Sequence, residues 1–405
     1  MAFANMLTSV RRDWRFSKRL IASYVFDWIL ILMTAAAGRI LKLAEPNRNP
    51  FSLTDPGISY PFAVHETVSV TVLILVSLVA PAIIIFLGSI LFIPGLTAGK
   101  HAPKALVWRR KIWEWNVGWM GLGIAYAGVY ASTEALKVMY GKPRPDLLSR
   151  CNPNLSDISS HVVGGLGERL EGAPLLVSYT ICQNTLETLT RDGFVSFPSG
   201  HASLSFAGLT YLTLWLCAKL SISIPYLAPR PYTQDTRQTA FSADDSNNNS
   251  NHTAVKTPLP FDAQYPSSSH HNESTSEPKL IQLRNQSAAP PTYLLAIAAA
   301  PIVATTYIAS SRWFDNRHYG FDILFGSLLG IFFAWLGFRW YHLPLTSGGA
   351  GWAWGARSPE RAFFAGIGVN GYAGPGLGKV IKPSSSSSLR PDSVSGVAQR
   401  GENSV

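Results

Sequence analysis

Six apolar runs, each about as long as a bilayer is thick, constrain the fold of this chain more than any other feature. A transmembrane helix needs about 20 predominantly apolar residues, whereas soluble helices and strands mix apolar and polar positions periodically. Only 14% of the 405 residues are charged, against about 25% in ordinary soluble domains. We therefore predict an all-α, polytopic membrane protein built as a six-transmembrane helical bundle. The expected spans are 20–43, 68–92, 116–136, 201–218, 293–310 and 323–341.

Basic residues near the ends of these spans predict how the chain crosses the membrane. They crowd positions 11–19, before the first span, and positions 100–111, before the third. Loops with an excess of Lys and Arg stay in the cytoplasm, so we expect residues 1–19 to form a basic cytoplasmic N-terminus. We expect no cleavable signal peptide, because this basic region runs into a long first span without a small-residue cleavage pattern.

A formal net charge of +10 at pH 7 is compatible with nucleic-acid binding or with membrane topology. The basic residues are scattered among apolar spans and form no basic helix or aromatic-studded groove, which argues against nucleic acid as a partner. Membrane topology accounts for the excess of basic residues. The sequence indicates no particular protein partner.

Two long polar stretches divide the chain. Residues 221–291 are rich in Ser, Asn, Thr and Pro and cannot bury enough apolar surface to fold alone, which predicts a disordered cytoplasmic loop. Residues 343–405 are rich in Gly and Ser, and we predict a disordered cytoplasmic tail. The other parts are residues 20–220, with four predicted spans, and residues 292–342, with two.

The loop between the third and fourth spans falls on the non-cytoplasmic side of this topology. It contains Cys151 and Cys182, which an oxidising lumen would allow to pair as a disulfide. Nothing in the sequence determines the distance between the two thiols, so the paired and unpaired states remain alternatives. Asn154 in the same loop begins a sequon and is a candidate acceptor of a glycan.

Three short motifs carry residues suited to chemistry, and on this topology all of them emerge on the non-cytoplasmic side. They are Lys137 followed by Arg144-Pro145, then Pro198-Ser199-Gly200-His201, and then Ser311-Arg312 followed by His318 and Asp322. Each motif alone has an ordinary interpretation, as a snorkelling anchor, a helix N-cap or a surface helix pair. Their order and their shared side instead indicate one common site.

The residue types suit the binding of a phosphomonoester dianion. Lys137, Arg144 and Arg312 supply three cations, and the planar fork of arginine suits two phosphate oxygens at once. We expect Ser199 and Gly200 at the start of the fourth helix, where unpaired N–H groups and the helix dipole attract an anion. With this much fixed positive charge, no metal and no cofactor is expected.

Two histidines and one carboxylate can divide the catalytic steps. If the segment from Tyr319 onward is helical, His318 and Asp322 lie one turn apart, so that the carboxylate fixes the orientation of the imidazole. Our hypothesis is that His318 attacks phosphorus to form a phosphohistidine, while His201 protonates the departing alkoxide and later activates water. The reverse assignment of the two histidines stays open, although the nearby Asp322 favours this one.

Together the three motifs resemble the signature of the type 2 phosphatidic acid phosphatase (PAP2) superfamily of lipid phosphate phosphatases, which is distantly related to vanadium haloperoxidases. The resemblance implies a helical bundle of the PAP2 and haloperoxidase type, with the same roles for His318, His201 and Asp322. It also implies metal-independent hydrolysis of phosphatidate, diacylglycerol pyrophosphate or lysophosphatidate to diacylglycerol-type products and phosphate. Residues 23–28 and 144–151 are similar to the fungal diacylglycerol pyrophosphate and lipid phosphate phosphatases.

The motifs leave the substrate and the compartment open. Sphingoid phosphates, polyprenyl pyrophosphate and glucose 6-phosphate are alternative substrates, and a catalytically silent lipid-binding membrane protein is an alternative of another class. We expect a multi-pass protein of an endomembrane (ER, Golgi or vacuole) or of the plasma membrane, with its site on the luminal or extracellular side. Four further residues near the motifs are expected to support the site or to select the substrate, namely Lys142, Asp146, Asp315 and Arg317.

Overall fold

The computed structural model describes residues 17–93, 104–184, 186–220, 222, 291–345, 353–363 and 372. The chain divides into two compact units, of which the larger is Asp27–Trp354 and the smaller joins Met1–Phe26 with Gly355–Val405. Most of the predicted N-terminus 1–19, nearly all of the predicted loop 221–291 and most of the predicted tail 343–405 lie outside the described residues.

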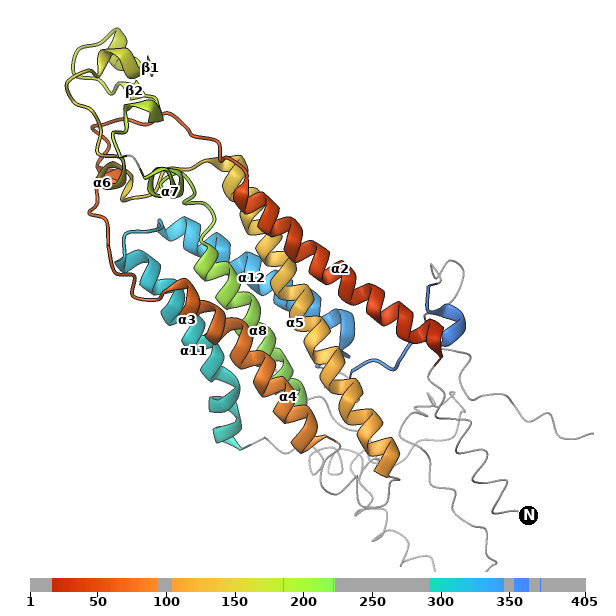
Figure 1. The fold of residues 1–405 in the computed structure, drawn as a ribbon. Helices are drawn as coiled ribbons and strands as arrows, with labels where there is room; N and C mark the ends of the chain where they lie inside the picture. Colours follow the sequence, from red (N-terminus) through yellow and green to blue (C-terminus); the bar gives the residue numbers. More distant parts are fainter. Residues whose placement is uncertain are drawn as a thin grey trace, which may run out of the picture. The chain divides into compact units, whose positions relative to one another are not determined.

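Six long helical segments dominate the described part of the chain (Figure 1). They are α2 (Lys18–Leu43), the run of α3 (Val70–Ile74), η2 (Leu75–Val79) and α4 (Ala80–Phe92), then α5 (Lys104–Tyr140), α8 (Gly200–Lys219), α11 (Thr292–Phe314) and α12 (Gly320–Tyr341). By length and composition, α2, Val70–Phe92, α11 and α12 could each cross a membrane. Glycine, serine and threonine dilute the apolar character of α5 and α8, so the number of spans stays a prediction.

Helix α5 is longer than the predicted third span. It begins at Lys104, within the basic segment, although the apolar run begins near residue 116. The intervening residues include Lys, Ala, Leu, Arg and Glu, which are all good helix formers. Backbone propensity therefore extends the helix beyond the part that hydrophobicity alone predicts.

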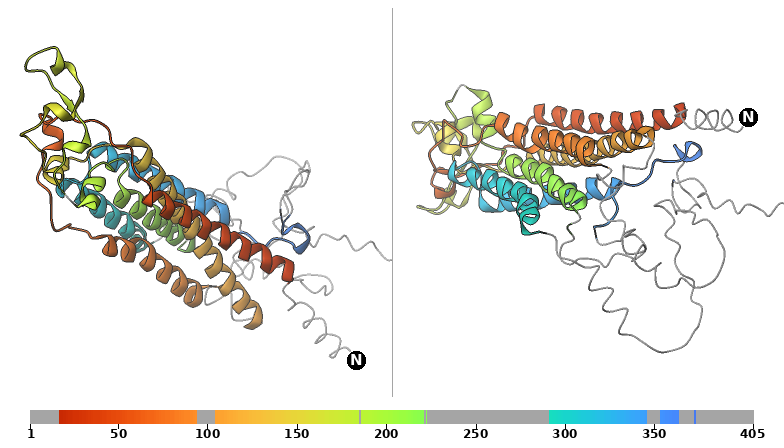
Figure 2. Two further views of the ribbon diagram at one scale, coloured as in Figure 1. Left: turned by 45° about the horizontal axis from the view of Figure 1, so that its top comes forward. Right: turned by 90° about the horizontal axis from the view of Figure 1, so that it is seen from below.

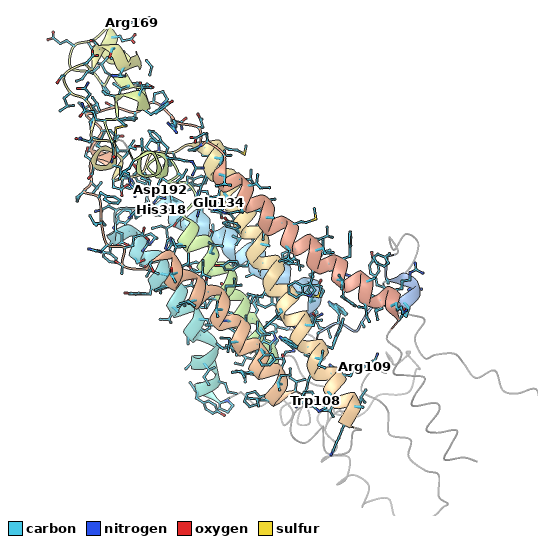
Figure 3. The ribbon with its side chains drawn as sticks, viewed as in Figure 1. Trp108, Arg109, Glu134, Arg169, Asp192 and His318 are labelled. Atoms are coloured by element: carbon cyan, nitrogen blue, oxygen red, sulfur yellow. A yellow bond between two sulfur atoms is a disulfide. The ribbon has the colours of Figure 1, made fainter. Side chains whose placement is uncertain are left out.

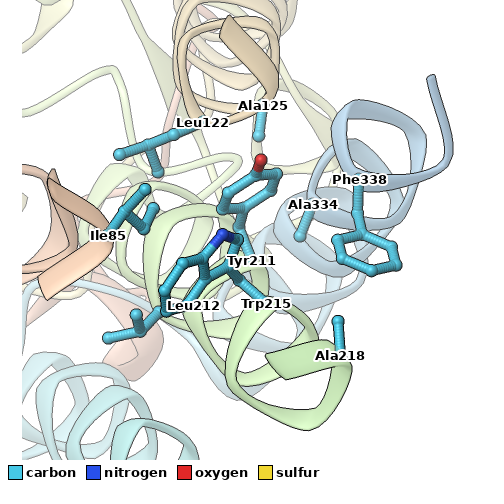
Figure 4. Close-up of a cluster of buried hydrophobic side chains, with 9 residues drawn as sticks. All are labelled: Ile85, Leu122, Ala125, Tyr211, Leu212, Trp215, Ala218, Ala334 and Phe338. Atoms are coloured by element: carbon cyan, nitrogen blue, oxygen red, sulfur yellow. The ribbon is translucent and has the colours of Figure 1, made fainter. Parts of the chain in front are cut away.

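Helix α8 is central in the larger unit and packs against α5, α11 and α12. Its first half carries buried small residues such as Ala202 and Ala207, which let neighbouring helices approach closely. Its second half carries larger side chains, and Tyr211 and Trp215 pack with Phe338 of α12 in the apolar cluster of Figure 4. Close packing at α8 thus sets the relative positions of the helices that carry the three motifs.

A proline in the second predicted span is accommodated by a π-helical turn. Pro81 has no N–H, so the carbonyl of Ser77, four residues earlier, cannot receive the usual helical hydrogen bond. The segment Leu75–Val79 is π-helical, which redistributes the hydrogen bonds at this point. Gly208 of α8 lies against the Ser77 carbonyl, where any Cβ atom would clash. Glycine at position 208 is therefore required for the close approach of α8 to the helical run that contains Ser77.

One end of the helices in the larger unit carries a folded cap, which we define as the described residues of 44–66 and 141–199 (Figures 1 and 2). Its helices are α6 (Leu147–Cys151) and α7 (Glu187–Asp192), and its strands β1 (Val162–Gly164) and β2 (Leu176–Val177) pair antiparallel. Its 3-10 turns are η1 (Pro56–Ile58), η3 (Ser159–His161), η4 (Leu166–Glu168) and η5 (Tyr179–Ile181). The sequence predicts no strand, because strands of two or three residues are too short to show a periodic pattern.

The cap has an apolar core and a disulfide of its own. Phe51, Leu147 and Phe194 are buried together in this core. Cys151 and Cys182 form a disulfide that joins residues separated by 31 positions. The disulfide ties the end of α6 to the segment that leads into α7, and both helices carry residues that line the candidate site described below.

We expect a Cys151→Ser/Cys182→Ser variant to be less stable by about 3 to 4 kcal/mol, because the cross-link restricts a loop of this length in the unfolded chain. Thermal unfolding of the purified protein in detergent, with and without a reductant, measures the effect. The wild-type protein should lose stability on reduction, whereas the variant should be insensitive to the reductant. Equal melting temperatures for the oxidised wild type and the variant would contradict a stabilising role.

The smaller unit contains the start of α2 and an ordered part of the tail. Ser23 Oγ donates a hydrogen bond to the Ala362 carbonyl at 2.7 Å, and Arg357 Nη1 donates to Ser23 Oγ at 2.6 Å. The turn η8 (Pro359–Arg361) lies between these tail residues. The disorder expected for the tail stays a prediction, and in its described part these hydrogen bonds join the segment around η8 to the start of α2.

Candidate active site

The three sequence motifs meet at the end of the larger unit that carries the cap. Figure 3 shows Glu134, Asp192 and His318 close together at this end, while Trp108 and Arg109 lie at the opposite end of α5. The groups come from the end of α5, the start of α8, the end of α11 and the start of α12. Segments far apart in the sequence therefore contribute to one site.

The first and second motifs meet where α5 ends and α8 begins. Lys137 Nζ donates to Glu134 Oε1 at 2.8 Å and reaches over Gly200, where an added Cβ atom would lie 3.0 Å from this ammonium group. Ser199 is the N-cap residue of α8, but its N–H donates to the Asp322 carbonyl at 3.0 Å. The Ser199 N–H is therefore not available to an anion, contrary to the expectation from sequence, whereas its buried Oγ has no hydrogen-bond partner among the described residues.

Arg144 is held by the end of α7. Its Nε donates to the Asp192 carbonyl at 2.7 Å, and its Nη2 donates to Asp192 Oδ1 at 2.9 Å. Arg150 Nη1 reaches the other carboxylate oxygen at 2.9 Å. Burial alone would raise the pKa of Asp192, but the guanidinium groups of Arg144 and Arg150 lower it to about 2. Asp192 is therefore charged at neutral pH and fixes Arg144 in place.

The second and third motifs share partners from the segment before α3. Arg312, which is 1% exposed, donates to Glu66 Oε2 at 3.0 Å, to the Val68 carbonyl at 3.1 Å and to Asp315 Oδ2 at 2.7 Å. The Nε2 atom of His201 lies 3.1 Å from the same Val68 carbonyl and 3.9 Å from Glu66 Oε2. One short segment thus brings His201 and Arg312 together.

His318 lies between α11 and α12 and is oriented by a backbone carbonyl. Its Nδ1 is 2.6 Å from the carbonyl oxygen of Ser196, so Nδ1 carries the proton and Nε2 keeps its lone pair. Nε2 makes no hydrogen bond with any residue that the structure describes. Burial and the nearby charges of Arg144 and Lys137 hold the pKa of His318 well below its usual range. The imidazole is therefore neutral, and its Nε2 is unprotonated.

The sequence predicted a direct contact between His318 and Asp322, and this prediction is wrong. Helix α12 begins at Gly320 with Tyr319 as its N-cap residue, so His318 precedes the helix and does not share a face with Asp322. The buried Asp322 carboxylate instead accepts hydrogen bonds from Ser196 Oγ at 2.6 Å, Lys142 Nζ at 2.7 Å and the Tyr319 N–H at 3.3 Å. Asp322 holds Ser196, and Ser196 in turn orients His318.

Four residues outside the motifs and not expected from the sequence contact the site, namely Glu66, Glu134, Asp192 and Ser196. Asp192 and Ser196 shortly precede the second motif, so their position in the sequence offered a signal. Glu66 offered none, because it lies 246 positions from its partner Arg312. Each motif cation has a carboxylate partner, and an incoming phosphate dianion must share these cations with the carboxylates.

Two further residues named in the sequence analysis are Asn154, which lies in the cap, and Arg317, which lies between α11 and α12. Asn154 is partly exposed, and its side-chain oxygen accepts a hydrogen bond from the Ser156 N–H at 3.1 Å. Arg317 lies between two carboxylates of the site. Its Nη2 is 3.1 Å from Glu66 Oε1, and its Nη1 is 3.6 Å from Asp192 Oδ2. Its backbone carbonyl also accepts a hydrogen bond from Arg144 Nη1 at 3.4 Å.

The sequence of this chain matches the model of a known protein family. The family model of the PAP2 superfamily matches residues 118–344, which include all three motifs. The chain belongs to the PAP2 superfamily. No solved structure matches the chain significantly.

Relatives with names of phosphatases support this membership. Diacylglycerol pyrophosphate phosphatase 1 of Saccharomyces cerevisiae is 26% identical over 323 residues, which cover 79% of this chain and 80% of the relative. Probable diacylglycerol pyrophosphate phosphatase 1 of Schizosaccharomyces pombe is 30% identical over 182 residues, which cover 44% of this chain and 54% of that protein. Probable lipid phosphate phosphatase 4 of Arabidopsis thaliana is 23% identical over 210 residues, which cover 50% and 56%. The last two alignments therefore span about half of each relative.

Proposed function

We propose that this PAP2 protein is a membrane-embedded phosphatase of lipid phosphates that acts through a phosphohistidine on His318. The observation that carries the proposal is the hydrogen bond from His318 Nδ1 to the Ser196 carbonyl, because it leaves Nε2 unprotonated in a site near Lys137 and Arg144. Fixed cations beside a positioned nucleophile are the main requirements of phosphoryl transfer.

The reaction proceeds in two displacements. In the first, the Nε2 lone pair of His318 attacks phosphorus and the bond from phosphorus to the ester oxygen breaks, while His201, protonated in the complex with substrate, gives its proton to the departing alkoxide and becomes neutral. In the second, His201 takes a proton from water and the water oxygen attacks phosphorus. The bond from phosphorus to Nε2 then breaks, which releases orthophosphate and restores His318.

The names of the relatives and the position of the site support a substrate class. The relatives are named as phosphatases of lipid phosphates or of diacylglycerol pyrophosphate. The site lies at the ends of helices that include four long apolar ones, where a phosphate headgroup can bind while its acyl chains stay among apolar side chains. We infer hydrolysis of phosphatidate, diacylglycerol pyrophosphate or lysophosphatidate to diacylglycerol-type lipids and phosphate.

The membrane arrangement in this proposal has six spans. Helices α5 and α8 complete it, because both pack among the apolar helices α4, α11 and α12. From the basic clusters at residues 11–19 and 100–111 we infer that the chain enters its first and third spans from the cytoplasm, with the cap and the site luminal or extracellular. A disulfide in the cap agrees with an oxidising compartment.

We expect phosphate release from phosphatidate in detergent micelles to be unchanged by EDTA, because the three cations of the motifs stabilise the developing negative charge in place of a metal ion. Vanadate should inhibit, because it adopts a five-coordinate geometry that resembles the transition state. Measuring phosphate release with and without each reagent tests the proposal. A strict requirement for magnesium would contradict it, and so would insensitivity to vanadate at millimolar concentration.

A further inference from the structure

Four aromatic side chains meet beside the site, where the ends of α5, α8 and α12 come together. In this aromatic cluster, the ring centroid of Phe197 lies 4.8 Å from those of Tyr140 and Phe325, and 5.9 Å from that of Phe321. The rings of Phe197 and Phe321 are nearly parallel, with an interplanar angle of 11°. Centroid distances of about 4.5 to 7 Å are typical of favourable aromatic pairs, so the four rings form a continuous apolar surface.

The chain connects the aromatic cluster directly to the reacting groups. Phe197 follows Ser196, whose carbonyl oxygen orients His318. Tyr140 lies three positions beyond Lys137 in the last turn of α5. A phosphate bound by Lys137 and attacked by His318 therefore has the aromatic cluster as an immediate apolar neighbour.

The outer members of the cluster are exposed. Phe197 is only 7% exposed, but Tyr140 is 54% and Phe321 is 64% exposed. Leu324 and Leu328 of α12, each 57% exposed, continue the apolar surface along the same helix. The distance from Phe321 to Leu328 corresponds to a rise of about 10 Å along a helix. An exposed apolar track thus begins at the phosphate site and runs down a helix that is apolar enough to cross a membrane.

We propose that this aromatic cluster, with the track along α12, is the subsite that binds the acyl chains next to the headgroup of the lipid substrate. The inference rests on the proposed function and adds to it the place where the apolar part of the substrate is held. A lipid phosphate joins a dianion to hydrocarbon chains, and the structure places a cationic site next to an apolar track in the same way. Aromatic residues at membrane interfaces also serve as plain anchors, and an anchor would not distinguish long acyl chains from short ones.

A variant with both exposed rings removed, Tyr140→Ala/Phe321→Ala, tests the subsite. We measure kcat and KM in mixed micelles for dioleoyl phosphatidate and for dihexanoyl phosphatidate, which have the same headgroup. We expect kcat/KM for the long-chain lipid to fall about tenfold through a higher KM, which corresponds to about 1.4 kcal/mol. The value for the short-chain lipid should change less than about twofold, since the short chains cover little of the track.

A matched control comes from α11. Phe314 is 78% exposed at the same end of the larger unit but is not part of the aromatic cluster, so Phe314→Ala should leave both substrates unaffected. Equal losses for the long and short lipids in the double variant, no loss for the long one, or an equal long-chain loss in Phe314→Ala would each overturn the subsite. A wild-type protein that hydrolyses neither phosphatidate would instead overturn the proposed function.

Discussion

Replacement of His318 by alanine should lower the rate of phosphate release by about 10⁴-fold or more, the size of effect seen when a catalytic nucleophile is removed. The structure supplies the reason, because His318 Nε2 is an unprotonated nitrogen near Lys137 and Arg144 and makes no hydrogen bond with any described residue. The depressed pKa of His318 keeps the imidazole neutral well below pH 6.5, so the loss should be equally large at pH 5.5 and pH 7.5. The loss is measured as phosphate release from phosphatidate by the purified wild-type and His318→Ala proteins at both pH values.

A matched control separates this chemical loss from damage to the fold. His161 lies in the cap, where its Nδ1 pairs with Thr180 Oγ1 at 2.9 Å, and His161→Ala should retain near wild-type activity. Both variants should elute from a size-exclusion column and melt as the wild type does. Residual activity of His318→Ala above a few per cent would show that another group attacks phosphorus, and His201 would then be the candidate.

The positions of the helices and the meeting of the three motifs could be predicted from the sequence. Hydrophobic runs of about 20 residues determine where long helices form, and they predicted α2, α11 and α12 to within a few residues. The order of the motifs predicted which histidines and cations would meet. Their convergence follows from the small buried residues of α8, which allow α5, α11 and α12 to pack around one helix.

The partners of the charged groups could not be predicted, because they come from distant segments. Glu66 reaches Arg312 and Arg317 only when the segment before α3 lies beside the end of α11, and no local pattern marks it as a site residue. The role of Asp322 was also predicted incorrectly, because its contacts depend on where α12 begins. A carboxylate three residues after a helix N-cap bonds the N-cap N–H, so Asp322 caps α12 and leaves His318 outside the helix.

Replacement of Asp322 by alanine should lower kcat about 10³-fold while KM changes less than about threefold, because the carboxylate positions the nucleophile without touching the phosphate. The buried carboxylate accepts hydrogen bonds from Ser196 and Lys142, and the carbonyl of Ser196 aligns His318. Asp322→Asn keeps the size of the side chain and one oxygen that accepts from Ser196, so it should lose only about 10- to 100-fold. Steady-state kinetics on phosphatidate in mixed micelles measure both variants.

A double-mutant cycle with Ser196→Ala shows whether Asp322 positions His318 through Ser196 or acts on His318 without it. If Asp322 acts through Ser196, the two side chains belong to one chain of hydrogen bonds, and their effects on kcat should not multiply. Ser196→Ala alone should cost about 10- to 100-fold, because the aligning carbonyl remains but the loop loses its link to α12. The double variant Ser196→Ala/Asp322→Ala should then be no more than about twofold slower than Asp322→Ala. Effects that multiply fully would mean that Asp322 acts on His318 without Ser196, as the spacing of the motif first suggested.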